Sequence, residues 1–351
     1  MLTNIRIQGF KCLDDVSLQL APLTLLVGSN SSGKSTVFQA ILLNHSVFQQ
    51  RNGVYLKEVV KPYSLFEDVA SRISNPSEVI ISIEQDGNER TTVLKRDGLQ
   101  LRDETHQAAV QQEPRKYEES LYYLAANRIG LQELTELNPE LRIGDTGQYA
   151  LSYLEQHKDK PIHSELVVKE APARTLKAQL AWWLSFITGI SAEARTQKVT
   201  STIVKTSFVM DEIGEVSPNN TGAGNGFLLK VCILCLASKP GDLLIIENPE
   251  IHLHPAAQSR LAKLLVHLSA KGVQLLVETH CEHLINRVRY EVYRRTLPAQ
   301  DLMIYYKQAF DQPFERLHLN PRGHFCDEQG NERPFPSGFF DSTLSELLEM
   351  G

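Results

Sequence analysis

The sequence predicts an α/β fold with a mixed β-sheet core and a helical second lobe. Three short apolar runs predict the class, because parallel strands buried on both faces read as near-continuous hydrophobic segments. These runs are residues 23–27, 242–246 and 273–277. Each is followed by apolar residues at helical spacing, in residues 35–48, 256–270 and 281–290. Strands that alternate with helices are typical of an α/β domain.

Further elements are predicted around this core. Residues 79–83 and 91–94 read as strands on either side of the turn sequence Asp86-Gly87-Asn88, which predicts a β-hairpin. Residues 196–209 are rich in β-branched side chains and predict strands. Helical spacing predicts three more helices, over residues 133–141, 171–187 and 226–237.

The composition is that of an ordinary globular chain. Its 351 residues include 36 lysines and arginines and 42 aspartates and glutamates, for a formal net charge of −6. This mild acidity argues against a protein that coats nucleic acid through positive charge alone, although it is compatible with a local basic groove. The five cysteines are few and odd in number, which favours a reducing compartment and a cytoplasmic protein. Apolar runs all fall short of the roughly 20 residues of a membrane helix, so we expect no membrane association.

The segment after the first buried strand has the pattern of a phosphate-binding loop. Residues 28–35 read GSNSSGKS and fit G-x4-G-K-[ST]. Glycine lets backbone N–H groups turn inward around a phosphate, and the N-terminus of the next helix favours negative charge. In this pattern Lys34 reaches the β- and γ-phosphates and the Ser35 hydroxyl ligates Mg²⁺. The sequence therefore predicts ATP and Mg²⁺ as cofactors, with nucleotide contacts from Asn30, Ser31, Ser32, Gly33, Lys34, Ser35 and Thr36.

A glutamate ends the strand predicted at residues 242–246. An acid at the carboxyl end of such a strand holds the Mg²⁺ of a nucleotide, directly or through water, and we assign this role to Glu247. Many P-loop ATPases have a second acid at the next position to activate water. Here that residue is Asn248, whose amide can position water but is a poor base. Glu250 could act as the base instead, or could simply cap the following helix.

A histidine follows the strand predicted at residues 273–277. His280 falls at the same carboxyl edge as Glu247, where it could contact the γ-phosphate or the attacking water. A single histidine is more often structural, but three motifs in this order favour a functional role.

Because Lys34 and Glu247 must meet at one nucleotide, we expect a single domain over residues 1–351. Residues from about 70 to 210 would then form insertions and the second lobe.

These motifs resemble those of a known family. The phosphate-binding loop, the segment ENPEIHLHP at residues 247–255 and the segment ETH that ends at His280 resemble the ABC-type ATPases. The resemblance is to the SMC-like and OLD-like branch of bacterial AAA-family ATPases, and it implies a P-loop NTPase fold of the ABC-ATPase head type. Glu247 then matches the metal-binding acid and His280 the switch histidine. Residues 5–11 are similar to the first strand of the branch, and residues 337–341 resemble the C-terminal end of one uncharacterised subfamily.

The resemblance also implies a homodimer that encloses ATP. A signature motif at a helix N-terminus of one subunit would cap the γ-phosphate held by the other. The candidate is the segment TGAGNG at residues 221–226, with Gly224 as the nucleotide contact. Gly226 replaces the usual serine, and Asn248 the usual catalytic acid, which predicts slow turnover. Residues 63–69 lie where the family has its Q-loop but contain no glutamine, and Arg128 lies where the branch often has an arginine near the nucleotide.

This sequence lacks two features that define particular members of the branch. Lys34 and Gly222 are only about 190 residues apart, without sustained heptads, which excludes the long coiled coil of a chromosome clamp. Only about 70 residues follow His280, without a paired-acid strand motif, so we expect no Toprim nuclease in this chain. Stand-alone members of the branch often accompany a separate effector, frequently a nuclease, in anti-phage defence. The alternatives are a nucleotide-gated scaffold with little hydrolysis, or a DNA-repair ATPase that binds nucleic acid ends.

Three other features have simpler explanations. Cys232 and Cys235 lie in an apolar helical segment without a second pair, which indicates buried core cysteines rather than a redox or zinc site. Trp182 and Trp183 indicate core or dimer interface rather than base stacking. A group of arginines after His280 is interpreted as a solvated helix face, with a surface for nucleic acid or an acidic partner as the alternative. These are Arg287, Arg289, Arg294 and Arg295.

Overall fold

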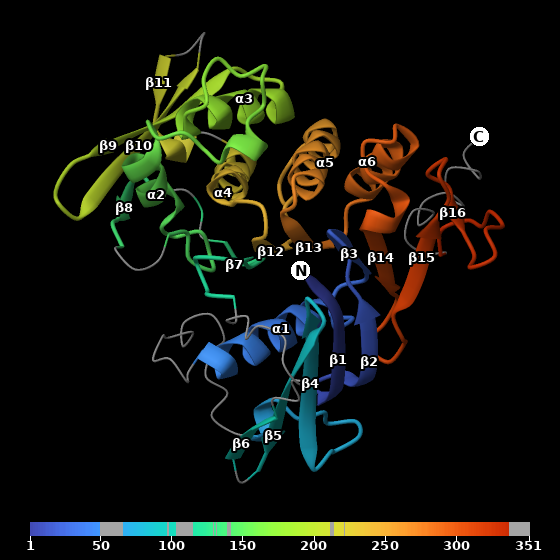
Figure 1. The fold of residues 1–351 in the computed structure, drawn as a ribbon. Helices are drawn as coiled ribbons and strands as arrows, with labels where there is room; N and C mark the ends of the chain where they lie inside the picture. The colour runs from blue at the N-terminus through green and yellow to red at the C-terminus, as the bar shows by residue number, and fades with distance from the viewer. Residues whose placement is uncertain are drawn as a thin grey trace, which may run out of the picture. The chain divides into compact units, whose positions relative to one another are not determined.

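The structure of the protein is a computed structural model. It describes residues 1–49, 66–96, 98–102, 115–128, 130, 132–138, 142–210, 214–220 and 222–336. The chain divides into two compact units, which are treated separately below (Figure 1). The first unit consists of residues 1–117 and 298–351, and the second of residues 118–297. The phosphate-binding loop therefore belongs to the first unit, and the strand ends at Glu247 and Thr279 belong to the second.

An antiparallel sheet of five strands forms much of the first unit. Its order is β2-β1-β4-β5-β6. The strands are β1 (Leu2–Phe10), β2 (Leu13–Gln19), β4 (Glu78–Gln85), β5 (Asn88–Lys95) and β6 (Gly98–Arg102). The predicted hairpin is confirmed: Gln85 pairs with Asn88 across Asp86 and Gly87, whose φ angles of 50° and 79° match a two-residue hairpin turn. Helix α1 (Lys34–Gln49) lies alongside β1 and β4 (Figure 1).

The first unit also contains the strand that leads into the phosphate-binding loop. The strands β3 (Leu23–Gly28), β14 (Leu302–Lys307), β15 (Glu315–Leu319) and β16 (Phe325–Cys326) follow the order β16-β15-β14-β3. β3 and β14 are parallel, whereas β14, β15 and β16 pair antiparallel, so the predicted mixed sheet is confirmed. Every residue of β3 is buried, as its continuous apolar run predicts. Short 3-10 turns occur at η2 (Phe66–Asp68) and η5 (Ala299–Asp301).

Three parallel strands form the centre of the second unit. They are β7 (Leu121–Leu124), β12 (Leu243–Glu247) and β13 (Gln274–Thr279), in the order β13-β12-β7. The helices are α4 (Ala223–Ala237), α5 (Pro255–Ala270) and α6 (Glu282–Tyr293), and Figure 1 shows α5 and α6 side by side. The predicted strand–helix alternation is confirmed here to within a few residues. The register pairs Glu247 with Glu278, which places two carboxylates at neighbouring strand ends.

A smaller antiparallel sheet and two helices complete the second unit. In the sheet, β10 (Ile203–Met210) pairs with β8 (Leu134–Glu136), β9 (Ala192–Lys198) and β11 (Gly214–Val216). The helices are α2 (Ala150–His157) and α3 (Leu176–Thr188), with 3-10 turns η3 (Ser164–Leu166) and η4 (Pro218–Asn220). The helix predicted at residues 133–141 is wrong where the structure describes it. Pairing with β10 overrides the weak helix propensity of this short segment.

Candidate nucleotide-binding and hydrolysis site

The phosphate-binding loop runs from the end of β3 at Gly28 to the start of α1 at Lys34. Its two glycines are required by the backbone. Gly28 has a φ of +137°, and a Cβ atom there would lie 1.9 Å from the carbonyl oxygen of Lys307. Gly33 has a φ of +102°, and a Cβ atom there would lie 2.5 Å from the Cys12 sulfur. Larger residues at either position would therefore force the loop open.

Lys34 lies inside the turn that this loop makes. Its side chain is only 2% exposed, and its ammonium donates to the carbonyl oxygens of Gly28 at 3.2 Å and Ser29 at 2.6 Å. A phosphate held by the backbone N–H groups of the loop would lie within reach of this charge. The loop therefore has the architecture that the motif predicts.

The other predicted contact residues line the same loop. Asn30 and Ser31 are exposed, and Ser31 has a φ of +59°, which turns the backbone at the tip. Ser35 is half-buried in the first turn of α1. Thr36 is buried, with its hydroxyl 3.7 Å from the Cys12 sulfur. Ser32 is also buried, and its hydroxyl lies 3.4 Å from the Lys34 ammonium.

Glu247 is the buried carboxylate at the end of β12. It is 7% exposed, and its two oxygens accept hydrogen bonds from the Tyr123 hydroxyl at 3.0 Å and the Ala126 N–H at 2.9 Å. Burial raises the pKa of Glu247, and the charge of Glu278 adds to this rise. A carboxylate offers about four lone-pair sites, so the two hydrogen bonds leave room for a further ligand. A cation such as Mg²⁺ fits this environment, because it would relieve the repulsion between the two carboxylates.

Glu250 is held by the end of β13. It is 6% exposed, and its Oε1 atom accepts hydrogen bonds from the Thr279 hydroxyl at 2.6 Å and the His280 N–H at 3.1 Å. Burial raises the pKa of Glu250, whereas the hydrogen bond from Thr279 lowers it. The alternative that Glu250 caps the following helix is wrong: the cap of α5 is His254, whose side chain accepts from the Ala256 N–H at 3.3 Å.

Asn248 lies between these two acids in an unusual backbone conformation. Its φ of +41° is left-handed, a region that asparagine tolerates better than most residues. Its N–H donates to the Glu278 carbonyl at 2.8 Å, which ties the residue to the neighbouring strand. The Asn248 carbonyl accepts from the Arg128 guanidinium at 3.0 Å. Arg128 therefore contacts the turn after β12. The sequence places this residue near the nucleotide only through the family resemblance.

His280 projects from the end of β13 and is partly accessible. Its side chain is 30% exposed, and its Nε2 atom lies 3.8 Å from a carboxylate oxygen of the buried Glu278. Sequence reasoning missed Glu278 and Tyr123 as members of this site. For Glu278 the signal was present: it follows a buried strand beside the strand that ends at Glu247. The structure therefore brings Glu247, Asn248, Glu250 and His280 together within the second unit.

Gly224 has a structural reason to be glycine. It lies in the first turn of α4, where a Cβ atom would lie 2.4 Å from the carbonyl oxygen of His252. The start of α4 therefore packs closely on the segment after β12. Its role as a nucleotide contact stays a prediction, and Thr221 lies outside the described residues, as do residues 63–65 and 337–341.

The structure also places the features that we interpreted as structural. Cys232 and Cys235 are completely buried in α4, which confirms them as core cysteines, and burial raises the pKa of both thiols. Trp183 is buried in α3. Within the described ranges, no three histidine, cysteine, aspartate or glutamate side chains are arranged to hold a metal ion. Over the same ranges, none of the helices combines the length and apolar character that a membrane crossing requires.

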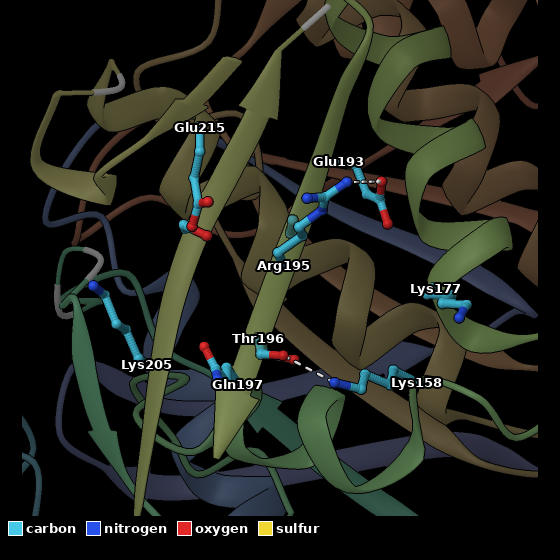
Figure 2. A pocket seen from close by; sticks show the side chains of 10 residues that line it. Lys158, Lys177, Glu193, Arg195, Thr196, Gln197, Lys205 and Glu215 are labelled. Atoms are coloured by element: carbon cyan, nitrogen blue, oxygen red, sulfur yellow. Dashed lines mark hydrogen bonds and ion pairs between the residues drawn. The ribbon is translucent and has the colours of Figure 1, made fainter. Parts of the chain in front are cut away.

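A cavity of about 410 Å³ lies on the small sheet of the second unit (Figure 2). Figure 2 shows Arg195 and Glu193 directed toward each other from β9, and Lys158 donating to the Thr196 carbonyl, at 2.9 Å. Each of its four basic residues has an acidic partner, so the cavity offers little uncompensated positive charge. The pairs are Lys158–Glu155, Lys177–Asp159, Arg195–Glu193 and Lys205–Glu133. We assign this cavity no part in nucleotide binding.

Comparison with known proteins agrees with this geometry. Residues 23–286, about three quarters of the chain, match the family model described as "AAA domain, putative AbiEii toxin, Type IV TA system". A stretch of 41 residues is 46% identical to the OLD nuclease of Thermus scotoductus (strain ATCC 700910 / SA-01). That stretch covers 12% of this chain and only 8% of the nuclease.

Two solved structures share the fold over nearly their whole length. One is the SmcHead bound to the C-winged helix domain of ScpA, with a TM-score of 0.58, 14% identity, and coverage of 91% of this chain and 98% of that one. The other is the Smc head domain with an extended coiled coil bound to the C-terminal domain of ScpA, derived from Pyrococcus furiosus. Its TM-score is 0.59, with 14% identity and coverage of 99% of both chains. At this identity the likeness concerns the fold alone. The chain therefore belongs to this AAA domain family and is an SMC-like/OLD-like ABC-type ATPase head in its fold.

Proposed function

We propose that this protein binds and hydrolyses ATP and uses the nucleotide to change its contacts with a separate effector protein. The observation that carries the proposal is the buried Lys34 ammonium inside a loop that requires glycine at positions 28 and 33. Such a loop at a helix N-terminus is a site for phosphate. The family match includes both this loop and the acidic strand end at Glu247, which supports a role for both motifs in one reaction.

In the proposed site, Lys34 and the backbone of residues 30–36 bind the phosphates of ATP. Ser35 and Glu247 would hold Mg²⁺, which neutralises charge on the phosphates when bound. Glu250 is the proposed base, because Thr279 and His280 occupy its Oε1 atom, whereas Oε2 has no hydrogen-bond partner among the described residues. Its raised pKa favours proton uptake from water. Asn248 positions the water, and His280 contacts the γ-phosphate.

The proposal includes an ATP-dependent homodimer in which Gly224 of one subunit contacts the nucleotide bound by the other. Structures of two similar heads are complexes with ScpA, so a head of this fold can carry a protein partner. The family description names a putative toxin of a type IV toxin–antitoxin system, which agrees with a role in anti-phage defence. The partner of this chain would be a separate effector, for which a nuclease is the leading candidate.

A nucleotide-gated scaffold with little hydrolysis is the second candidate. The observation that favours it is Asn248, an amide where an acidic base is expected. A DNA-repair ATPase receives less support, because Arg287, one of the basic residues of α6, is already paired with the buried Glu291 at 2.7 Å.

Two measurements on three proteins test the proposal: wild type, Lys34→Ala and the control Lys271→Ala. Lys271 is exposed at the end of α5, so its loss should leave nucleotide binding unchanged. We expect Lys34→Ala to lose affinity for a fluorescent ATP analogue and to release no phosphate. If wild type binds ATP but releases no more phosphate than Lys34→Ala, the scaffold replaces the enzyme. If wild type fails to bind ATP, both candidates are wrong.

The homodimer has its own test in light scattering with Glu250→Gln. This variant should bind ATP without hydrolysing it, and should double in mass only when MgATP is present. A mass that stays monomeric with saturating MgATP would contradict the dimer and leave ATP hydrolysis by the monomer standing.

A further inference from the structure

We propose that Arg128 is a positioning residue for hydrolysis, acting on the strand-end turn, which we define as residues 247–250. Through two backbone carbonyls it sets the direction in which Asn248 and Glu250 face a water molecule. The inference rests on the proposed ATPase function, and its test below separates the two.

The Arg128 guanidinium holds two consecutive carbonyl groups of the turn. Its Nη1 atom donates to the Asn248 carbonyl at 3.0 Å, and its Nη2 atom donates to the Glu247 carbonyl. A planar guanidinium presents these donors in a fixed fork, so the two contacts together fix the orientation of both peptide groups. A lysine at this position has a single ammonium and cannot impose the same constraint.

Burying the charge of Arg128 costs free energy, which indicates that this residue has a specific role. Arg128 is 6% exposed, and burial lowers its pKa to about 10, against the opposing charges of Glu250 and Glu247. A buried charge is unfavourable unless it is paired and hydrogen-bonded. The carbonyls and the two carboxylates supply that compensation, and all of them belong to the strand-end turn.

The turn needs such a restraint because of Asn248. Its φ of +41° lies in a sparsely populated region, which persists only when surrounding contacts hold it. On one side its N–H is bonded to the Glu278 carbonyl at 2.8 Å, and on the other its carbonyl is bonded to Arg128. Without Arg128, Asn248 could relax toward the right-handed region and carry its side chain with it.

Three buried atoms of this cluster match the hydrogen-bonding capacity of one water. Arg128 Nε, Asn248 Oδ1 and Glu250 Oε2 are all buried, and within the described part of the chain none has a hydrogen-bond partner. Together they supply one donor and two acceptors, and a water molecule, which donates two hydrogen bonds and accepts up to two, can satisfy all three. A water bound by these atoms would be oriented by Arg128 Nε and would give its proton to Glu250 Oε2.

The experiment compares kcat, KM and ATP affinity in wild type, Arg128→Ala, Arg128→Lys and the control Arg142→Ala. Arg142 also donates to an uncharged oxygen, the Tyr122 hydroxyl, at 3.0 Å, but among the described residues its side chain makes no hydrogen bond to the strand-end turn. We expect both Arg128 variants to lower kcat by roughly 10²-fold, the cost of a misplaced reacting group, with KM and ATP affinity nearly unchanged. Arg142→Ala should keep the wild-type kcat.

Chemical rescue provides a readout that a merely structural role would not change. Millimolar guanidinium, well below denaturing concentrations, should restore part of kcat in Arg128→Ala, whereas methylammonium should not. Neither ion should help Arg128→Lys, whose side chain fills the site. Because Arg128→Ala could fail to fold, Arg128→Lys, which keeps charge and most of the volume, carries the test by itself in that case.

The possible results distinguish a failure of the positioning role of Arg128 from a failure of the proposed ATPase function. If wild type shows no turnover above Lys34→Ala, the ATPase function and this inference both fall. If wild type turns over and Arg128→Lys keeps its kcat, only the positioning role is wrong. The same holds if the Arg128 variants lose ATP affinity in proportion to kcat, or if methylammonium rescues as well as guanidinium.

Discussion

The Oε1 atom of Glu250 accepts a hydrogen bond from the Thr279 hydroxyl at 2.6 Å, which links the turn after β12 to the end of β13. The same oxygen accepts from the His280 N–H at 3.1 Å. The carboxylate of the proposed base therefore also anchors the backbone of His280, the proposed γ-phosphate contact. A displacement of His280 on nucleotide binding would be transmitted directly to Glu250.

Thr279→Val tests this link, because valine keeps the shape and removes the hydroxyl. We expect the free energy of unfolding to fall by about 1–3 kcal/mol, since the buried carboxylate loses a donor. The hydrogen bond from Thr279 also lowers the pKa of Glu250, so its loss should move the acidic limb of the pH–rate profile to higher pH. Thr279→Ser keeps the hydroxyl and should behave like wild type in both measurements. Equal profiles for the valine and serine variants would contradict the link.

A second prediction concerns the position of the acidic limb of the pH–rate profile. Burial raises the pKa of Glu250, and a general base must be ionised, so kcat should fall with decreasing pH at values above the ordinary glutamate range. Glu250→Gln should lower kcat by at least roughly 10²-fold and remove this limb from any residual activity. An unaltered limb in Glu250→Gln would assign the titration to another group, with Glu247 as the first candidate.

Glu250→Gln should lower kcat, but it should not lower the stability of the fold. With a raised pKa, the folded state binds more protons than the unfolded state between the ordinary and the raised values, so stability decreases as pH rises through that window. Glutamine keeps the oxygen that accepts from Thr279 and His280 and removes the buried charge. Glu250→Gln should therefore unfold at the same or a higher urea concentration than wild type at neutral pH. A large loss of stability would show that the carboxylate serves mainly to hold the fold.

Asn248→Glu is the third change that we expect to be informative. It restores a carboxylate at the position where many P-loop ATPases have their base, so steady-state phosphate release should increase. Asn248→Ala is the matched control, because it removes the amide without adding a base and should lower the rate. If Asn248→Glu is no faster than Asn248→Ala, the slow turnover predicted from this position has another cause.

Glu118 offers a prediction on stability that is independent of nucleotide. It is 3% exposed, and its two oxygens accept from three successive N–H groups, those of Arg142, Ile143 and Gly144, at 2.7–2.9 Å. Glu118→Gln removes one accepting oxygen, so urea unfolding should show a loss of about 1–3 kcal/mol. The neighbouring Glu119 is exposed, and Glu119→Gln should change stability by less than about 0.5 kcal/mol. Equal effects of the two substitutions would contradict the anchoring role of Glu118.

The sequence predicted the parts of the structure that depend on neighbouring residues. The phosphate-binding loop is contained in eight successive residues, and β3, β12 and β13 each contain a short, near-continuous apolar run of the kind that buried parallel strands have. The error at β8 has a different origin. Its partner β10 lies more than 60 residues further along, so nothing local in residues 133–141 reveals the pairing.

The strand-end turn shows the same limit within the site. Glu247 and Asn248 were predicted from their position after a strand, but the arginine that holds their carbonyls comes from residue 128, and Tyr123 from the neighbouring β7. The pattern around Arg128 contains no sign that its donors bind backbone rather than phosphate. Such contacts between distant residues emerge only from the register of β7, β12 and β13.

We propose above all that this chain hydrolyses ATP at Lys34 with Glu250 as the base. The most direct measurement is steady-state phosphate release by wild type, Lys34→Ala and Glu250→Gln at saturating MgATP, with ATP binding measured on the same samples. We expect turnover in wild type alone, and ATP binding in wild type and Glu250→Gln but not in Lys34→Ala. Wild-type phosphate release no greater than that of Lys34→Ala would contradict it.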